Sequence, residues 1–172
     1  TKYGWSKAPH QRETAMVVGS VSLAPPLPSL IVFDLDFTLW QRPRFRKGPP
    51  FEPIDGGAAG VRDAGGATLY LYPAAKRALV CLADAGVPVA VASRTHREGW
   101  ARQWLEMLTV DDAGRTVQDV IDPLPVLVQD GPKSGHLQRI SEMSGVPLSK
   151  MLFFDDDLAG KRTLIRRSGP HS

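Results

Sequence analysis

The 172-residue chain contains a single cysteine, Cys81, and no long run of apolar residues. One cysteine excludes an internal disulfide, which is typical of a reducing compartment, so we expect a cytoplasmic protein. A membrane-spanning helix needs roughly 20 consecutive apolar residues, and no segment approaches that length, so no membrane partner is expected. The four histidines are scattered through the chain and lack the spacing of a zinc site.

The chain also has little net charge, with a formal value of +3. Its basic side chains form two small clusters, within residues 42–47 and 161–167. Each cluster is either solvated surface or a site that attracts phosphorylated or acidic substrates. Solvated surface is favoured, because a small net charge affects only encounter and solubility. Neither cluster has a nucleic-acid-binding motif or interleaved aromatic residues, so no nucleic-acid partner is expected.

The most informative segment is a short apolar run, residues 30–33, that leads directly into Asp34 and Asp36. The run is short, is rich in β-branched and aromatic residues and follows Pro28. These features predict a buried strand. Open α/β sheets bind ligands at the carboxyl ends of their strands. Two carboxylates this close repel each other unless a cation lies between them or one stays protonated. The pair therefore indicates a catalytic site.

Strands and helices are expected to alternate along the rest of the chain. We predict strands at residues 87–92 and 151–154, a weak edge strand at 120–128, and helices at 73–85, 98–108 and 134–144. Residues 40–67 are rich in proline and glycine and predict a long loop beside the site, with a small hairpin near 61–71. Strands that are apolar throughout are typical of a parallel sheet covered on both faces, so the expected class is α/β.

The domain organisation is expected to be simple. Residues 1–24 show neither helical nor strand periodicity and predict a disordered or loosely attached leader. Residues 25–172 have the length of a single domain with its own core. Cys81 falls within a helical pattern, which favours a buried core thiol over a nucleophile.

Polar residues follow three of the predicted strands, where a parallel sheet brings the strand ends to one edge. They are Asp34 and Asp36, then Ser93 and Arg94, and then Asp155 and Asp156, while Lys133 lies in the loop before the last predicted helix. Alone, each has an ordinary structural interpretation, because Asp and Ser cap helices and form turns and most lysines lie on the surface. The ordered set is much more specific and favours catalysis.

A phosphate monoester and a divalent cation would satisfy this set of residues. Magnesium prefers oxygen ligands and is typically held by one or two carboxylates plus substrate phosphate, which Asp34, Asp156 and Asp155 can supply. Asp34 can then attack phosphorus and form an aspartyl phosphate, while Asp36 serves first as general acid and later as general base. Ser93 can donate a hydrogen bond to a phosphoryl oxygen, and Lys133 can stabilise its charge.

At these residues the chain resembles the haloacid dehalogenase superfamily of phosphohydrolases, and most closely its small magnesium-dependent phosphatases. The resemblance is carried by residues 32–40, 71–73, 86–90, 92–95, 145–147 and 153–156, together with Lys133. It implies a Rossmann-like three-layer sandwich without a large cap domain. It also implies Asp34 as nucleophile and Asp36 as acid/base. The further residues that it implies are Leu35, Ser93, Arg94 and Lys133 around the phosphate, and Asp34, Asp36, Asp156 and Asp155 at the magnesium ion.

The resemblance further implies aryl or tyrosine phosphates, or amine-linked sugar phosphates such as fructosamine phosphates, as substrates, free or on a phosphorylated or glycated protein. Family members continue past residue 157 with a helix and a strand, whereas residues 158–172 offer only a short helical pattern, so we expect a shortened carboxyl end. A shortened member that binds phosphorylated ligands without hydrolysing them is the alternative function.

Overall fold

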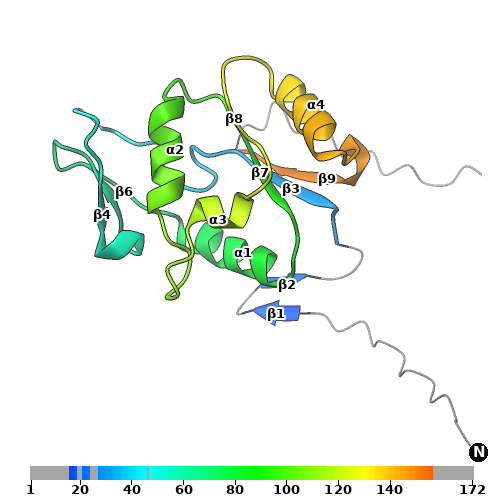
Figure 1. The fold of residues 1–172 in the computed structure, drawn as a ribbon, viewed down its shortest axis with the longest axis horizontal. Coiled ribbons are helices and arrows are strands. Elements are labelled where there is room, and N and C mark those ends of the chain that lie inside the picture. Colours follow the sequence, from blue (N-terminus) through cyan, green and yellow to red (C-terminus); the bar gives the residue numbers. More distant parts are fainter. Residues whose placement is uncertain (1–15, 19–20, 24–26, 46, 157–172) are drawn as a thin grey trace, which may run out of the picture.

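Four parallel strands form the central sheet of the computed structural model, which describes residues 16–18, 21–23, 27–45 and 47–156 (Figure 1). Their order is β8 (Val126–Val128), β7 (Val89–Ser93), β3 (Leu30–Phe33) and β9 (Met151–Phe154). All three neighbouring pairs are parallel. The predicted parallel sheet is therefore confirmed, and β3 lies in its interior.

Helices cover both faces of this sheet at β3, β7 and β8, whose side chains alternate between two apolar cores, whereas Leu152 and Phe154 of β9 are exposed. Leu30 and Val32 of β3 pack with Leu137 and Ile140 of helix α4 (Lys133–Ser144). Ile31 and Phe33 belong to the other core. The remaining helices supply that second core: α1 (Pro73–Asp84), α2 (Glu98–Met107) and α3 (Val117–Ile121). The fold is thus a three-layer α/β sandwich, as predicted.

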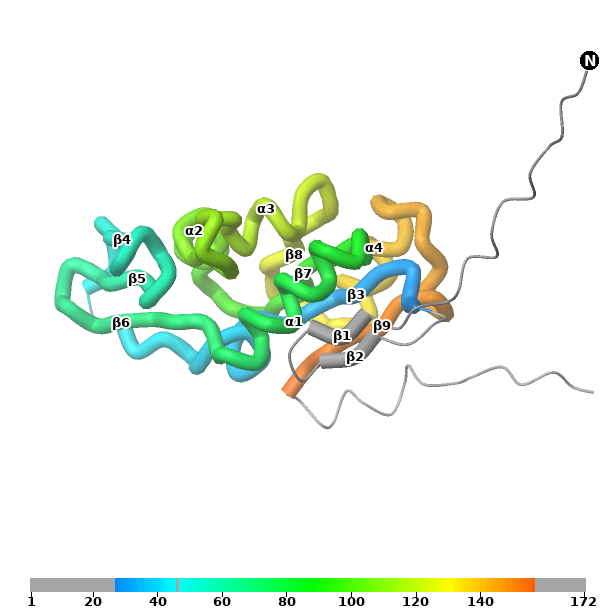
Figure 2. Tube along the Cα trace, turned by 90° about the horizontal axis from the view of Figure 1, so that it is seen from below, coloured from blue at the N-terminus to red at the C-terminus, as the bar shows by residue number. Residues whose placement is uncertain are grey.

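A second, antiparallel sheet lies beyond the carboxyl end of β3 and consists of β4 (Glu52–Ile54), β5 (Gly60–Arg62) and β6 (Thr68–Leu69), with a 3₁₀ turn at Asp55–Gly57 (Figures 1 and 2). The prediction of a long loop over residues 40–67 was therefore wrong in its extent, although a hairpin near 61–71 was expected. Aromatic packing explains the difference: Phe45 and Phe51 contact Trp100 and Trp104 of α2, with ring centroids 5.2–6.4 Å apart.

One buried carboxylate, Asp63, fixes the turns around the small sheet. Its Oδ1 accepts hydrogen bonds from the backbone N–H groups of Gly65 and Ala67 at 2.9 and 2.8 Å, and its Oδ2 from those of Lys47 and Gly48 at 3.2 and 3.3 Å. Burial tends to raise the pKa of Asp63, but these four donors outweigh it and hold the pKa below its ordinary value. The proline- and glycine-rich segment is therefore tied together by a single side chain.

The weak strand predicted at residues 120–128 is correct only at its end. Residues 117–121 form α3, because Thr116 accepts a hydrogen bond from the Asp119 N–H at 3.1 Å and the Asp119 carboxylate accepts one from the Thr116 N–H at 2.7 Å. Val126–Val128 form β8, which lies at an edge of the sheet, as expected. Cys81 is buried in α1, again as expected.

At the amino end, β1 (Met16–Val18) and β2 (Val21–Leu23) form an antiparallel pair that the prediction of a leader did not include. The rest of that predicted leader, residues 1–15, 19–20 and 24, lies outside the described residues, as does the tail that we expected to be shortened. The domain boundary at residue 25 therefore stays a prediction. Within the described part of the chain, no helix has the length and apolar character to cross a membrane.

Candidate active site

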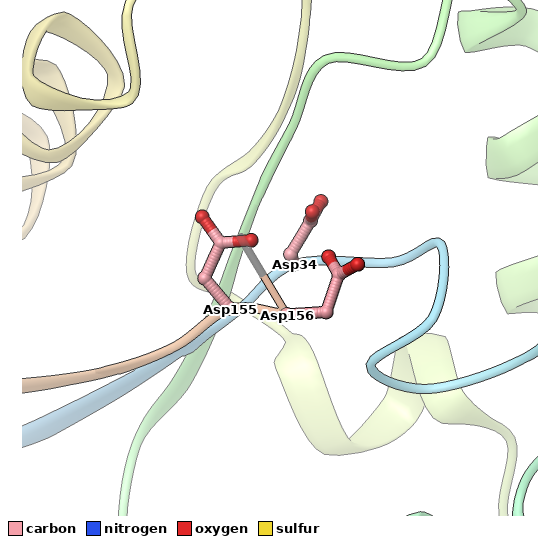
Figure 3. Close-up of side chains that lie close together, drawn as sticks. All are labelled: Asp34, Asp155 and Asp156. Carbon is pink, nitrogen blue, oxygen red and sulfur yellow. The ribbon is translucent and has the colours of Figure 1, made fainter. Parts of the chain in front are cut away.

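The register of β3 and β9 brings three carboxylates to one edge of the sheet. Phe33 pairs with Phe154, so the next residues, Asp34 and Asp155, lie side by side, with Asp156 following. One carboxylate oxygen from each of the three lies within 4.8 Å of the others. Figure 3 shows the side chains of all three gathered at this edge. The convergence expected from separate strand ends is therefore present.

Lys133, the first residue of α4, reaches into this group of carboxylates. Its Nζ lies 2.8 Å from Asp34 Oδ2 and 3.6 Å from Asp155 Oδ2, and it donates a hydrogen bond to the Ala92 carbonyl oxygen at 2.8 Å. The Lys133 side chain is only 11% exposed, so solvent screens these contacts weakly. The ammonium group therefore offsets part of the repulsion among the acids.

The Asp34 carboxylate is held in one orientation by contacts to both of its oxygens. The Leu35 N–H donates to Asp34 Oδ1 at 2.7 Å, while Lys133 contacts Oδ2. Asp34 is 8% exposed, and the Leu35 side chain is fully buried. Leu35 therefore reaches the site through its backbone N–H and not through its side chain. If Leu35 binds phosphate, as expected, the backbone N–H is the group that does so.

Asp36 is half-buried and does not belong to the group of three carboxylates. Its Oδ1 accepts a hydrogen bond from the Trp40 indole Nε1 at 3.0 Å. Burial raises the pKa of Asp36 above its ordinary value, and the charges of Asp34 and Asp156 raise it further, while Trp40 and Arg42 oppose the rise. A raised pKa suits a residue that must carry a proton; the expected role of Asp36 as a metal ligand stays a prediction.

Ser93 and Arg94 lie at the carboxyl end of β7, where the sequence predicted them. Ser93 is 1% exposed, and its Oγ accepts a hydrogen bond from the Thr95 N–H at 3.4 Å, which leaves the hydroxyl hydrogen available to a ligand oxygen. Arg94 is exposed immediately beyond the strand. Both residues lie at the same carboxyl edge as Asp34, because β7 and β3 are parallel neighbours.

Two features of this edge were not predicted from the sequence. His136 is 1% exposed, and neither ring nitrogen has a hydrogen-bond partner among the described residues. Burial lowers the pKa of His136, and the charges of Lys133 and Arg94 lower it further. The Asp130 backbone and the Asp34 charge act in the opposite direction but do not cancel the shift. The only signal in the sequence was its position three residues after Lys133, which places both residues on one side of α4.

The second feature is Phe37, which has a positive φ of 62° although it is neither glycine nor asparagine, and which is half-exposed. Its N–H donates to the Trp40 carbonyl oxygen at 2.6 Å. Left-handed backbone is rare for a bulky side chain and clusters at functional sites. The turn that follows Asp36 is therefore held in a strained conformation by its own hydrogen bonds.

Chemically, the edge combines a fixed carboxylate, a carboxyl group with a raised pKa, a buried ammonium group and a hydroxyl donor. The three clustered carboxylates match the oxygen ligands that magnesium prefers, and two or three such groups leave coordination positions for water and substrate. This arrangement fits nucleophilic attack on an electrophile whose developing negative charge is stabilised by cations.

Comparisons with known proteins place this arrangement in a family. The family model described as "Acid Phosphatase" matches residues 26–165. "Magnesium-dependent phosphatase 1" of Homo sapiens is 40% identical over 134 residues, which cover 76% of this chain and 69% of that protein. "HAD-like hydrolase superfamily protein P8B7.31" of Schizosaccharomyces pombe is 31% identical over 133 residues, which cover 76% of each chain.

A solved structure shares the fold. It is the N-terminal part of the protein BF1531 from Bacteroides fragilis, which contains a phosphatase domain complexed with Mg, and it superimposes with a TM-score of 0.52 at 18% identity. The match covers 79% of this chain and 32% of the Bacteroides chain. At that identity the similarity concerns the fold alone.

Proposed function

This chain belongs to the acid phosphatase family of haloacid dehalogenase-like hydrolases and is a magnesium-dependent phosphatase, and from that premise we propose that it hydrolyses phosphate monoesters through a phosphoryl group carried on Asp34. The family resemblance inferred from the sequence motifs is thus confirmed, whereas the mechanism and substrate are proposals. The observation that carries them is the meeting of Asp34, Lys133, Asp155 and Asp156 at one sheet edge.

Magnesium would be held by Asp34 and Asp156, with Asp155 as a further candidate ligand, since each offers an oxygen within 4.8 Å of the others. Bound there, the ion would neutralise negative charge on the phosphoryl oxygens. Asp155 also lies 3.6 Å from the Lys133 ammonium group. That second contact suits a residue that orients Lys133, which favours Asp156 over Asp155 as the direct ligand.

Asp34 would be the nucleophile. Its Oδ1 is hydrogen-bonded by the Leu35 N–H, so Oδ2, on the Lys133 side, is the oxygen to form the new bond to phosphorus. As that bond forms, the bond from phosphorus to the leaving oxygen breaks, and Asp36 transfers its proton to that oxygen. Asp36 then accepts a proton from the water that attacks phosphorus, which releases phosphate and regenerates the Asp34 carboxylate.

The remaining residues would bind the phosphoryl oxygens. Ser93 donates its hydroxyl hydrogen, Lys133 supplies a buried positive charge, and Arg94 provides a guanidinium group at the rim of the edge. Stabilising charge as it develops on these oxygens is the main way in which such a site lowers the barrier.

For the substrate, we propose an aryl or tyrosine phosphate or an amine-linked sugar phosphate, as a small molecule or on a phosphorylated or glycated protein. The half-exposed Phe37 ring beside Asp36 supports a substrate with a planar or ring-shaped leaving group. A reducing compartment such as the cytoplasm is proposed on the evidence of one cysteine, which is buried in α1.

The test is phosphate release from phenyl phosphate, measured with magnesium and with a chelator. Asp34→Asn should lower kcat by at least about 10³-fold, because removal of a nucleophile abolishes the covalent route. Asp112→Asn, an exposed aspartate in the turn before α3, is the matched control and should retain full activity. Retained turnover by Asp34→Asn would overturn the mechanism. If the native chain binds the uncleavable analogue phenylphosphonate but releases no phosphate from phenyl phosphate, the alternative is favoured. That alternative is a silent phospho-ligand-binding protein.

A further inference from the structure

A polar groove of about 390 Å³ lies where the segment after Trp40 runs beside the end of β6. The two segments are joined by an antiparallel bridge between Trp40 and Leu71 and by the hydrogen bond from the Tyr72 N–H to the Leu39 carbonyl oxygen, 2.8 Å long. Arg42 and Arg44 line one side of the groove, and Thr68 and Tyr70 line the other. The small antiparallel sheet thus contributes a wall that the central sheet lacks.

This groove lies on the Asp36 side of the site. The Trp40 indole donates to Asp36 Oδ1 at 3.0 Å, and Arg42 is two residues further along the chain. The Arg42 guanidinium is close enough to Asp36 for the two charges to interact. Lys133 and the three clustered carboxylates, in contrast, lie on the Asp34 side. Because Asp36 is the proposed proton donor to the leaving oxygen, the groove faces the leaving group.

The two arginines form no ion pair among the described residues. Among the described residues, neither guanidinium group has a carboxylate oxygen within ion-pair distance, whereas Arg62, Arg102 and Arg115 each form an ion pair. Arg42 and Arg44 are both exposed, and they line the same groove. Guanidinium groups match the geometry of carboxylate and phosphate oxygens and bind them with paired hydrogen bonds.

We infer that this groove is a subsite for a second anionic group on the leaving-group portion of the substrate, either a carboxylate or a second phosphate. The inference rests on the proposed function, since it assigns the leaving group to the Asp36 side. Arg42 and Arg44 bind the anion, and the exposed Tyr70 ring, 51% accessible, packs against the apolar part that carries it. The basic cluster seen in the sequence is thereby assigned to substrate recognition.

The experiment compares three aryl substrates that differ only in the second group: phenyl phosphate, 4-carboxyphenyl phosphate and 1,4-phenylene bisphosphate. The native enzyme should show a higher kcat/KM for one or both charged substrates, and whichever is favoured identifies the anion. Arg42→Gln and Arg44→Gln should each reduce that preference by about 10-fold to 100-fold, because hydrogen bonds to charged groups are strong. Arg62→Gln removes the same charge from the same small sheet, outside the groove, and should leave the preference unchanged.

Calorimetry keeps this inference separate from the proposed function. The uncleavable analogues phenylphosphonate and 4-carboxyphenylphosphonate, titrated with magnesium present, report binding whether or not the chain turns substrate over. Tighter binding of the carboxylated analogue that is lost in Arg44→Gln supports the subsite even if no phosphate is released. Equal affinity for the two analogues and equal kcat/KM for all three substrates would overturn it, as would a loss in Arg62→Gln as large as in Arg44→Gln.

Discussion

Replacing Lys133 by methionine removes the ammonium group that contacts Asp34 and Asp155 while keeping most of the side-chain volume. At an effective dielectric constant of about 20, the 2.8 Å contact to Asp34 corresponds to about 6 kcal/mol of attraction, before the cost of desolvating the ammonium group. Removing one partner of such a buried pair typically costs about 3–5 kcal/mol. In a domain of this size we expect the melting temperature to fall by about 6–20 °C in the presence of a chelator.

Magnesium should reverse part of this loss. The ammonium group lies beside Asp34 and Asp155, so its removal leaves the carboxylates more attractive to a cation. A ligand that binds the folded state raises stability by RT ln(1 + [L]/Kd), so tighter binding gives a larger gain. The rise in melting temperature on adding magnesium should therefore be larger in Lys133→Met than in the native chain.

Thermal unfolding, followed by calorimetry with chelator and with millimolar magnesium, measures both effects. Lys150→Met, which removes an exposed lysine from the turn before β9, is the matched control and should change little. The reasoning would be refuted if Lys133→Met and Lys150→Met were equally stable in chelator, or if magnesium stabilised the Lys133 variant no more than the native chain.

Three further predictions concern other parts of the fold. The pKa of Asp63 is lowered from 3.8, so its stabilising effect is present above pH 3.8 and is lost as the pH falls through the folded-state pKa. In urea titrations Asp63→Asn should therefore be less stable than the native chain at pH 7. The difference in unfolding free energy between the two should shrink toward pH 3. The pKa of His136 is lowered from 6.5, so the unfolded chain takes up its proton first; between pH 7.5 and 5.5 the native chain should lose more stability to urea than His136→Leu, and equal losses would contradict this. Gly57 has φ +94°, and a Cβ there would lie 1.9 Å from the Met107 carbonyl oxygen, whereas a Cβ at Gly56 would meet open space. In urea unfolding, Gly57→Ala should therefore cost about 2–4 kcal/mol and Gly56→Ala about 1 kcal/mol. Similar costs for the two variants would argue against the close approach of Gly57 to Met107.

The central sheet was predictable because each of its main strands carries its own signal. The apolar runs that end in Asp34, Ser93 and Asp155 indicate buried parallel strands, and parallel strands place their carboxyl ends together whatever lies between them. Lys133 could be added because it lies in the loop before the helix that connects the last two predicted strands. These inferences depend on local patterns plus topology, and both are contained in the sequence.

The small sheet was not predictable in the same way. Its strands are only two or three residues long and interrupted by glycine and proline, so no periodicity marks them. They are stabilised by distant contacts, namely the packing of Phe45 and Phe51 on Trp104 and the four backbone donors to Asp63. The position of the arginine groove depends on this sheet, so the function of the basic cluster had to remain open.

The isolation of His136 was equally beyond sequence reasoning. A histidine in a helix is compatible with surface, core or ligand roles. Only the packing of α4 on the sheet shows that both ring nitrogens are buried with no hydrogen-bond partner in the part of the chain that the structure describes. The raised pKa of Asp36 was expected from its acidic neighbours, but the structure assigns the larger effect to burial.

The most direct test of the proposed chemistry is to trap the phosphorylated enzyme. The native chain is mixed with phenyl phosphate and magnesium, quenched in acid within the first turnover and treated with borohydride, which reduces an aspartyl phosphate to homoserine. Peptide mass spectrometry should then find homoserine at position 34 and at no other aspartate. Phosphate release at the normal rate with Asp34 unmodified, or homoserine at Asp36 or Asp156, would contradict the assignment of Asp34 as the nucleophile.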